Sequence, residues 1–292
     1  MMAEHMMSQT TVVGVMGYPI GHSLSPIMHN AAYAAMGLPW VYVPFAAPPA
    51  ALATALAGLG ALGVRGVNVT IPHKQAVIPF MAELTPAAAA VGSVNTVAIT
   101  PAGLCGHSTD GHGFLRGLTE RGFPVQGARA VVLGAGGAAR AAVGALAGAG
   151  VAALTIVART PARAADLPAL AQRLAPAHIE TALASWDDVG VRDLLAQAHL
   201  LVNATSIGMT PQHSDEAPVP ADWLHPALWV YDLVYTPRRT ALLRAAAARG
   251  CPVIDGVAML VYQGAEAIAF WSGRPAPVTI MEAALAPYLR DG

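Results

Sequence analysis

The chain has 292 residues and a formal net charge of −1, and it is 55% hydrophobic but only 11% charged. This length suits one large or two ordinary domains, and the composition supplies enough apolar residues for substantial cores. The sequence has no basic run, which argues against binding driven by nucleic-acid phosphates. Cys105 and Cys251 lack metal-ligand spacing, so we expect no metal site and reduced thiols in a cytoplasmic protein.

The positive mean hydropathy of +0.50 raises the question of a membrane span. The longest stretch without Asp, Glu, Lys or Arg covers residues 5–64, but several prolines and glycines interrupt it. A spanning helix needs about 20 continuous apolar residues that are compatible with a helix. We therefore expect no transmembrane segment, and the N-terminus also lacks the basic start and apolar core of a signal peptide.

Short apolar runs alternate with helical stretches over the first 109 residues. Strands are predicted at 12–16, 41–45, 66–71 and 94–99, and helices at 27–36 and 50–61. Ser25 is a natural N-cap for the first of these helices, because Pro26 suits a first helical turn. Strands that alternate with helices predict an α/β unit with a mostly parallel sheet.

A second α/β unit is predicted to begin near Asp110. Its strands are expected at 128–133, 154–157, 200–202, 229–232 and 252–254, with helices near 113–118 and at 138–149, and the tail at 259–273 is expected to be a long helix. We therefore predict two α/β domains, covering residues 11–109 and 110–256.

A glycine-rich turn links the first strand and the following helix of the second unit. It consists of Gly134, Ala135, Gly136, Gly137 and Ala138. Such a turn allows close backbone approach and exposes a helix N-terminus, whose N–H groups and dipole hold a pyrophosphate. The next strand follows at about the expected distance, which favours dinucleotide binding over a purely structural turn.

The end of the next strand distinguishes between cofactors. Sites for NAD usually carry an acid there, which binds the ribose 2′-hydroxyl. This chain instead has Arg159, Thr160 and Arg163 and no carboxylate in the same stretch. Guanidinium groups suit bidentate phosphate contact, so the sequence predicts NADP, with Arg159 as the main contact. An ordinary solvated basic loop is the alternative.

Polar residues of the first unit suggest a site for a small substrate. Residues 68–74 read Asn-Val-Thr-Ile-Pro-His-Lys, so Lys74 follows a strand end and is placed for acid–base work. Asp110 offers a partner carboxylate, although a surface lysine and a helix-capping aspartate are the simpler readings. Ser23 and Ser25 lie two residues apart and suit a polyol or carboxylate, unless Ser25 only caps its helix. A lysine–aspartate pair beside a dinucleotide site suggests a dehydrogenase.

Several of these segments resemble the motifs of one enzyme family. Residues 17–30, Gly-Tyr-Pro-Ile-Gly-His-Ser-Leu-Ser-Pro-Ile-Met-His-Asn, are similar to the opening signature of shikimate dehydrogenases, and 68–74 resemble that family's catalytic lysine segment. Further matches occur in the family's order at 94–96, 109–111, 203–209, 232–237 and 259–263. The resemblance spans about residues 12–285, nearly the whole chain.

The resemblance implies an α/β fold with an N-terminal substrate-binding domain, a Rossmann-type NADP-binding domain and a C-terminal helical segment, 257–290, that returns to the first domain. The implied reaction is the reversible NADPH-dependent reduction of 3-dehydroshikimate to shikimate, on the pathway to chorismate and the aromatic amino acids. Lys74 and Asp110 would be the catalytic pair. By position, the implied substrate-binding residues are Ser23, Ser25, Thr70, Asn95, Tyr235 and Gln263. The glycine turn and Arg159 would hold the cofactor phosphates, and Leu233 and Gly256 would line the nicotinamide pocket.

Three residues depart from the family's usual pattern. Ser108 and Ala158 stand where asparagine is common, and Ala258 stands where a second glycine is frequent. Ala158 removes a hydrogen-bonding group near the 2′-phosphate or ribose, so the preference for NADP is expected to be less strict. Ala258 is expected to add a methyl group near the nicotinamide.

Other functions stay open at this point. The nearest is a quinate/shikimate dehydrogenase of the same family, which often uses NAD, and an aminoshikimate-type enzyme is a further variant. A catalytically silent Rossmann protein that binds a metabolite is the alternative from another class. Monomer and homodimer are both compatible with the sequence.

Overall fold

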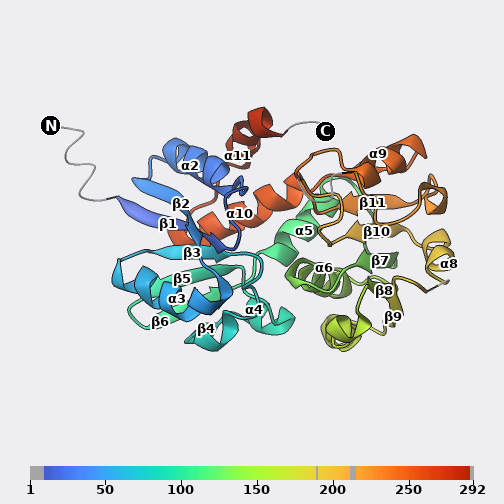
Figure 1. Cartoon of the computed structure of the whole chain (residues 1–292), viewed down its shortest axis with the longest axis horizontal. Helices are drawn as coiled ribbons and strands as arrows, with labels where there is room; N and C mark the ends of the chain where they lie inside the picture. Colours follow the sequence, from blue (N-terminus) through green and yellow to red (C-terminus); the bar gives the residue numbers. More distant parts are fainter. Residues whose placement is uncertain (1–9, 189, 211–214, 290–292) are drawn as a thin grey trace. The chain divides into compact units, whose positions relative to one another are not determined.

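The computed structural model describes residues 10–188, 190–210 and 215–289, and these divide into two compact units (Figure 1). Among the described residues, the first unit comprises 10–109 and 263–288, and the second comprises 110–188, 190–210, 215–262 and 289. Residues 257–262 thus belong to the second unit, whereas the sequence-based division gave them to the first. The reason is packing, because Tyr262 Oη donates a hydrogen bond to Glu120 Oε2 at 2.5 Å within that unit.

The first unit is built on a six-stranded sheet with the order β2-β1-β3-β5-β6-β4. Its strands are β1 (Thr11–Gly17), β2 (Trp40–Ala46), β3 (Gly66–Val69), β4 (Glu83–Leu84), β5 (Thr96–Thr100) and β6 (Gly103–His107). β1 pairs in parallel with β2 and β3, whereas β5 runs antiparallel to both β3 and β6. β4 also pairs in parallel with β6, so the sheet is mixed, with three of its five pairings parallel.

A tight hairpin between β5 and β6 explains the mixed sheet. Thr100 pairs with Gly103, so only two residues connect the strands. A connection this short can join only antiparallel neighbours, since a parallel crossover needs a dozen or more residues. Gly103 has φ +117°, a conformation that a side chain would strain. The Pro-Ala-Gly sequence at 101–103 is a turn signal, although the expected strands did not include β6.

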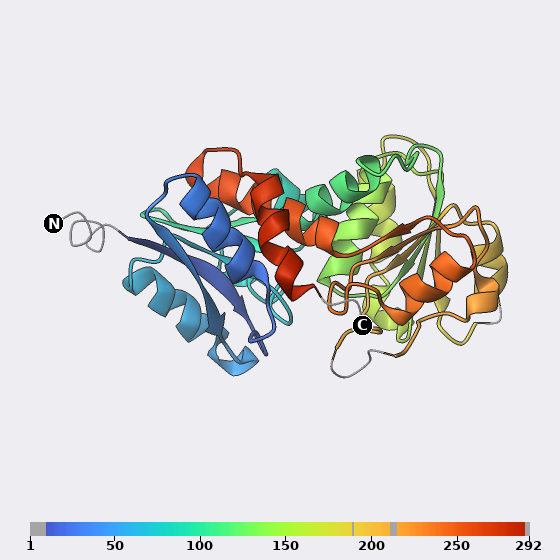
Figure 2. The ribbon, with the colours of Figure 1, turned by 90° about the horizontal axis from the view of Figure 1, so that it is seen from above.

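Helices cover both faces of the first sheet. They are α2 (Ser25–Ala35), η1 (Pro49–Ala51), α3 (Leu52–Ala61), η2 (Ile78–Phe80), α4 (Pro86–Val91), α11 (Val278–Leu285), η5 (Ala286–Tyr288) and the last part of α10 (Val257–Ser272). Val67 packs with Leu52, Leu56 and Leu59 of α3, whereas a side chain at neighbouring Gly66 would meet Trp271 of α10. Successive strand residues point to opposite faces, so α3 and α10 lie on opposite sides, and α2 packs beside α11 (Figure 2).

The start of α2 differs from the expected cap. The helix begins at Ser25, and its N-cap is Leu24, which has helical backbone angles and makes no side-chain capping bond. Ser25 N–H instead donates to Ser23 Oγ at 3.3 Å. The prediction that Ser25 caps this helix was wrong, because the backbone turns helical one residue before it.

The second unit contains six parallel strands with the order β12-β11-β10-β7-β8-β9. These are β7 (Arg129–Leu133), β8 (Ala153–Ala158), β9 (Glu180–Ser185), β10 (Leu200–Asn203), β11 (Trp229–Asp232) and β12 (Val253–Ile254). The surrounding helices are α5 (Asp110–Thr119), α6 (Gly137–Gly148), η3 (Pro161–Ala164), α7 (Leu167–Leu174), α8 (Val191–Ala196), η4 (Ala221–Trp223) and α9 (Ala241–Ala248). This strand order is that of the dinucleotide-binding Rossmann fold, with its switch point between β7 and β10.

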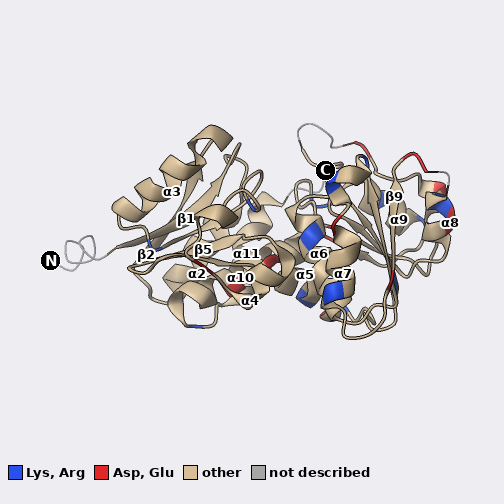
Figure 3. Ribbon diagram, turned by 90° about the horizontal axis from the view of Figure 1, so that it is seen from below, with Lys and Arg blue, Asp and Glu red and all other residues tan. Residues whose placement is uncertain are grey.

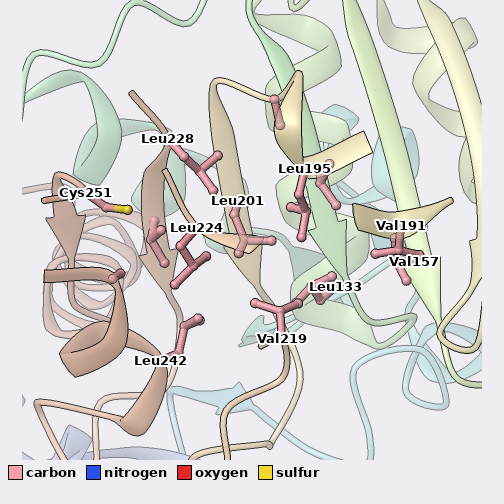
Figure 4. Close-up of a cluster of buried hydrophobic side chains, with 14 of the residues drawn as sticks. Leu133, Val157, Val191, Leu195, Leu201, Val219, Leu224, Leu228, Leu242 and Cys251 are labelled. Atoms are coloured by element: carbon pink, nitrogen blue, oxygen red, sulfur yellow. The ribbon is translucent and has the colours of Figure 1, made fainter. Parts of the chain in front are cut away.

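Apolar side chains on one face of this sheet form a continuous core. Leu133, Leu201 and Val157 pack with Leu195 of α8 and Leu242 of α9 (Figure 4). On β11, Val230 belongs to this cluster, whereas neighbouring Tyr231 stacks on Phe114 of α5 with ring centroids 5.2 Å apart. The parallel strands are thus buried on both faces, as expected for helix-covered sheets.

The longest helix in the described part of the chain, α10, has 16 residues. None of the helices within that part is both long and apolar enough to cross a membrane.

Candidate functional site

The candidate site residues fall into two sets according to unit. The first unit contains Ser23, Ser25, Thr70, Lys74, Asn95 and Gln263. The second unit contains Asp110, Gly134, Ala135, Gly136, Gly137, Ala138, Arg159, Thr160, Arg163, Leu233, Tyr235 and Gly256. Each set is built by its own sheet.

In the first unit, the segments that follow β1 and β3 are held side by side. Thr70 N–H donates to Met16 O at 2.9 Å, and Tyr18 N–H donates to Ile71 O at 3.0 Å. A side chain at Gly17 would lie 2.5 Å from Thr70 Cγ2, so only glycine fits there. The parallel pairing of β1 and β3 therefore brings the loop with Ser23 and Ser25 to the same end of the sheet as the lysine segment, the end where both strands finish.

Lys74 is half-buried, and its backbone is fixed from two sides. The preceding residue, His73, is buried and its Nε2 is hydrogen-bonded to Ala47 O at 2.7 Å. Lys74 O accepts a hydrogen bond from Val94 N–H at 2.8 Å, one residue before Asn95. The lysine is therefore part of an ordered strand-end turn, with its backbone anchored next to the segment that contains Asn95 and leads into β5.

Asn95 and Gln263 are brought together although 168 residues separate them in the chain. Asn95 Nδ2 donates to Thr109 Oγ1 at 2.8 Å and to Gln263 Oε1 at 3.3 Å, while Asn95 Oδ1 accepts from Thr109 N–H at 2.8 Å. Asp110 follows Thr109 directly and is the first residue of α5, where it is 3% exposed. A carboxylate at a helix start is favoured by the helix dipole.

In the second unit, the glycine turn contains one glycine with an unfavourable backbone conformation and one glycine with open space around it. Gly134 has φ +120°, and a Cβ there would lie 2.9 Å from Ala204 O, so glycine is required. Gly136 is the N-cap of α6, and a Cβ there would meet nothing within 4 Å. The first turn of α6 contains no acidic residue and has no side-chain cap. These features fit an anionic group held by backbone N–H groups.

The loop after β8 carries the expected positive charge. Arg159, Thr160 and Arg163 are exposed, and the first carboxylate that follows them, Asp166, forms an ion pair with Arg140 of α6. The Lys and Arg positions, coloured blue along the ribbon in Figure 3, lie mainly in the second unit. An acid-free loop with two arginines fits a nucleotide that carries an additional phosphate.

The loops after β10 and β11 are joined by a buried carboxylate. Asp232 is fully buried, and it accepts hydrogen bonds from Asn203 Nδ2 at 2.9 Å, Val234 N–H at 3.0 Å and Thr240 Oγ1 at 2.6 Å. Burial raises the pKa of Asp232 to about 6, and the hydrogen bonds oppose this shift. The aspartate therefore fixes the path of the segment that contains Leu233 and Tyr235.

Leu233 and Gly256 are in direct contact. A Cβ at Gly256 would lie 2.5 Å from Leu233 O, so the two backbones approach as closely as only glycine permits. Tyr235 is half-buried, and desolvation raises the pKa of its phenol to about 12. The phenol thus remains a neutral hydrogen-bond donor over the physiological pH range.

The residues that depart from the family pattern have defined surroundings. Ala258 is buried, and its methyl group faces α5, 3.4 Å from where Gly117 would carry a Cβ. Ala158 is the buried last residue of β8, and Ser108 is buried before Thr109. The Ala258 methyl group thus contributes to helix packing within the second unit.

Sequence reasoning did not select four polar residues that organise the two sets. Asn68, Thr96 and Thr109 contact Asn95 by hydrogen bonds, and Asp232 joins the loops of the second unit. All four lie within the motifs quoted for the family resemblance, or directly next to Asn95. Polar residues inside otherwise apolar strands were the available signal, since buried polar groups need partners.

Comparison with known proteins identifies the family over most of the chain. Residues 15–97 match the shikimate dehydrogenase substrate binding domain, 118–211 match the shikimate / quinate 5-dehydrogenase family, and 256–286 match the shikimate 5′-dehydrogenase C-terminal domain. A shikimate dehydrogenase (NADP⁺) of Moorella thermoacetica is 51% identical over 279 residues, covering 95% of this chain and 93% of that protein.

Solved structures agree with this assignment. The shikimate 5-dehydrogenase of Thermus thermophilus, in complex with NADP(H) and shikimate, has a TM-score of 0.84 and 36% identity, covering 96% of this chain and 100% of that one. A quinate dehydrogenase from Corynebacterium glutamicum in complex with NAD has a TM-score of 0.85 and 33% identity, covering 95% and 98%. With domain matches, near full-length relatives and the Rossmann unit in agreement, the chain belongs to the shikimate dehydrogenase family.

Proposed function

We propose that the chain catalyses the reversible NADPH-dependent reduction of 3-dehydroshikimate to shikimate, on the pathway to chorismate and the aromatic amino acids. The observation that carries this proposal is the near full-length identity to NADP⁺-dependent shikimate dehydrogenases. The acid-free loop with Arg159 and Arg163 supports the choice of NADP, because it offers guanidinium groups where NAD sites offer a carboxylate.

The first unit binds the substrate in this proposal. Ser23 and Ser25 donate hydrogen bonds to the substrate carboxylate, and Thr70, Asn95 and Gln263 hold ring hydroxyls. Tyr235 of the second unit adds a neutral phenol donor. The hydrogen bond between Asn95 and Gln263 supports a shared task for these two amides, since both reach the same point of the first unit.

Lys74 acts on the oxygen of the reacting carbon. When NADPH is bound, it supplies the hydride that reduces the ketone. The Lys74 ammonium donates its proton to the oxygen as negative charge develops there, and in the oxidation direction the neutral amine accepts that proton. Asp110 is the partner carboxylate that orients the lysine and binds the substrate.

The second unit holds the cofactor. The backbone of residues 134–138 binds the pyrophosphate at the N-terminus of α6, and Arg159 binds the 2′-phosphate with help from Thr160 and Arg163. Leu233 and Gly256 line the nicotinamide pocket. The open space at Gly136 supports the first of these roles, because a phosphate can approach the backbone there.

Initial rates of shikimate and quinate oxidation, each with NADP⁺ and with NAD⁺, test the proposal on purified protein. Fast turnover with shikimate and NADP⁺ alone supports it. Comparable rates with quinate or NAD⁺ favour a quinate/shikimate dehydrogenase, a second candidate supported by the likeness to an NAD-bound quinate dehydrogenase and by Ala158. No turnover in any combination would point to a silent metabolite-binding protein.

We further propose a cytoplasmic enzyme, since both cysteines are free and a reducing compartment keeps them so. Monomer and homodimer are distinguished by analytical ultracentrifugation.

A further inference from the structure

A chain of buried hydrogen bonds leads from β2 through β3 to Asn95. Tyr42 Oη donates to Asn68 Oδ1 at 2.7 Å, Asn68 Nδ2 donates to Thr96 Oγ1 at 2.9 Å, and Thr96 Oγ1 donates to Asn95 Oδ1 at 3.2 Å. Tyr42, Asn68 and Thr96 are all buried. Burying such polar groups is costly unless each has a hydrogen-bond partner. A series of three buried polar side chains in one sheet therefore suggests that they have a specific role.

The bonds made by the Asn68 amide have a determined direction. Asn68 Nδ2 also donates to the backbone carbonyl of Asn95 at 3.1 Å. A carbonyl can only accept, so the amino group of Asn68 must face Asn95 O and its oxygen must face Tyr42. The Thr96 hydroxyl accepts from Asn68, and its own hydrogen has two possible acceptors, Asn95 Oδ1 at 3.2 Å and Thr109 Oγ1 at 3.5 Å, of which Asn95 Oδ1 is the nearer.

The orientation of the Asn95 side-chain amide, at the end of the series, is also determined by its partners. Thr109 N–H can only donate, and it reaches Asn95 Oδ1 at 2.8 Å. An Asn95 amide rotated by 180° would place its amino group against the Thr109 N–H donor. The observed orientation instead directs the amino group of Asn95 to Thr109 Oγ1 and to Gln263 Oε1.

The contact with Gln263 is the longest of the Asn95 side-chain hydrogen bonds described above, at 3.3 Å. It joins an N–H donor on Asn95 to a carbonyl acceptor on Gln263. A hydroxyl group both accepts and donates, so a ligand hydroxyl can replace this contact and satisfy both amides. A group that only accepts could bind the Asn95 N–H but could not donate to the Gln263 oxygen.

We propose that Asn68 and Thr96 are positioning residues that act through Asn95. Their hydrogen bonds hold the Asn95 amide so that its N–H, opposite the Gln263 carbonyl, receives a ring hydroxyl of the substrate. This inference rests on the proposed function, in which Asn95 and Gln263 bind ring hydroxyls. It adds two residues, remote from the substrate, that set the preference for a hydroxyl at that point.

Thr96→Val and Thr96→Ser test the proposal. Valine keeps the shape but removes the hydroxyl, so the KM for shikimate is expected to rise about tenfold, the loss of roughly one buried hydrogen bond. The kcat and the KM for NADP⁺ should change less than about twofold, and Thr96→Ser should restore the wild-type KM. Thr155→Val, a buried threonine on β8 in the second unit, is the matched control and should leave the KM for shikimate unchanged.

A double-mutant cycle asks whether Thr96 acts through Asn95. Calorimetry measures the Kd for shikimate of wild type, Thr96→Val, Asn95→Ala and the double variant. If Asn95 transmits the effect, Thr96→Val should change the Kd by less than about twofold in the Asn95→Ala background. An equal effect in both backgrounds, or an unchanged KM in folded Thr96→Val, overturns the proposal.

Two further outcomes are separable. If Thr96→Val does not fold, Tyr42→Phe removes the hydroxyl at the start of the series, and an unchanged KM for shikimate in that variant overturns the proposal. If wild type turns over no shikimate and binds none, the proposed function fails first. If wild type turns over shikimate and these variants keep the wild-type KM for shikimate, only the positioning role is rejected.

Discussion

Both units contain a buried polar network, but the two networks differ in charge. In the first unit, Asn68, Asn95, Thr96 and Thr109 are joined through neutral amides and hydroxyls. In the second unit, Asn203 and Thr240 converge on one carboxylate, that of Asp232. Each network holds segments at strand ends of its own sheet, where candidate binding residues lie.

The difference has a physical consequence. A network of neutral groups keeps its hydrogen-bond directions at any physiological pH, which suits recognition of uncharged hydroxyls. A buried carboxylate binds its hydrogen-bond donors more strongly, but its desolvation links the stability of the loops to pH. The hydrogen-bond directions of the first unit are thus independent of pH. The loops of the second unit are held more strongly, but their stability depends on pH.

The largest expected effect separates chemistry from binding in the first unit. Lys74→Ala should lower kcat by about 10²–10⁴, because it removes the general acid–base group. The KM for NADP⁺ should stay near the wild-type value, since the cofactor residues belong to the second unit. Steady-state kinetics of shikimate oxidation measure both values, and a kcat within a few-fold of wild type would contradict the role of Lys74.

The carboxylate network predicts a pH dependence that the neutral network lacks. The folded-state pKa of Asp232 is raised to about 6 from its ordinary value of 3.8. The folded state therefore binds this proton more tightly, and the group's contribution to stability falls as the pH rises from about 4 through 6. The loss is on the order of 2–3 kcal/mol.

Asp232→Asn should remove this part of the pH dependence. An asparagine oxygen can accept from Asn203 and Val234, and its amino group can donate to Thr240, so the loops keep their hydrogen bonds. Urea unfolding of wild type and variant at pH 4.5 and 7.5 measures the effect. Between pH 4.5 and pH 7.5, the free energy of unfolding should fall more in wild type than in the variant. Equal changes in the two proteins would refute the raised pKa of Asp232.

Arg159→Ala tests the positive loop of the second unit. Loss of a charge-assisted hydrogen bond should raise the KM for NADP⁺ by about 10- to 100-fold, with little change for NAD⁺. The KM for shikimate should be unaffected. Arg173→Ala, near the C-terminus of α7, is a matched control, and an equal rise for both cofactors would mean that the arginine does not bind the 2′-phosphate.

Two glycines of one turn separate backbone strain from cofactor binding. Gly134→Ala should lower stability by about 1–3 kcal/mol, because φ +120° is unfavourable for alanine and its Cβ would press on Ala204 O. Gly136→Ala has open space and φ −84°, so it should fold with nearly wild-type stability. Its methyl group should still hinder the pyrophosphate and raise the KM for NADP⁺ about tenfold. Thermal melts and kinetics distinguish the two, and identical behaviour would contradict the account.

Local sequence patterns were sufficient for many elements. The strands expected at 200–202 and 229–232 correspond to β10 and β11, and the helix expected at 138–149 corresponds to α6. Buried parallel strands and amphipathic helices carry periodic apolar residues that can be recognised locally. β9 and β6 were not expected, because Glu180–Ser185 is rich in alanine and Gly103–His107 contains two glycines.

The sequence by itself determined the α/β class, the family, the glycine turn and the acid-free loop with Arg159, because each depends on residues close together in the chain. Only the tertiary structure decided which way the Asn95 amide points and that Gln263 lies against it. It also decided that Asp232 joins two loops. These features depend on hydrogen-bond partners from distant segments, and a buried polar group has a defined orientation only when all of its partners are in place.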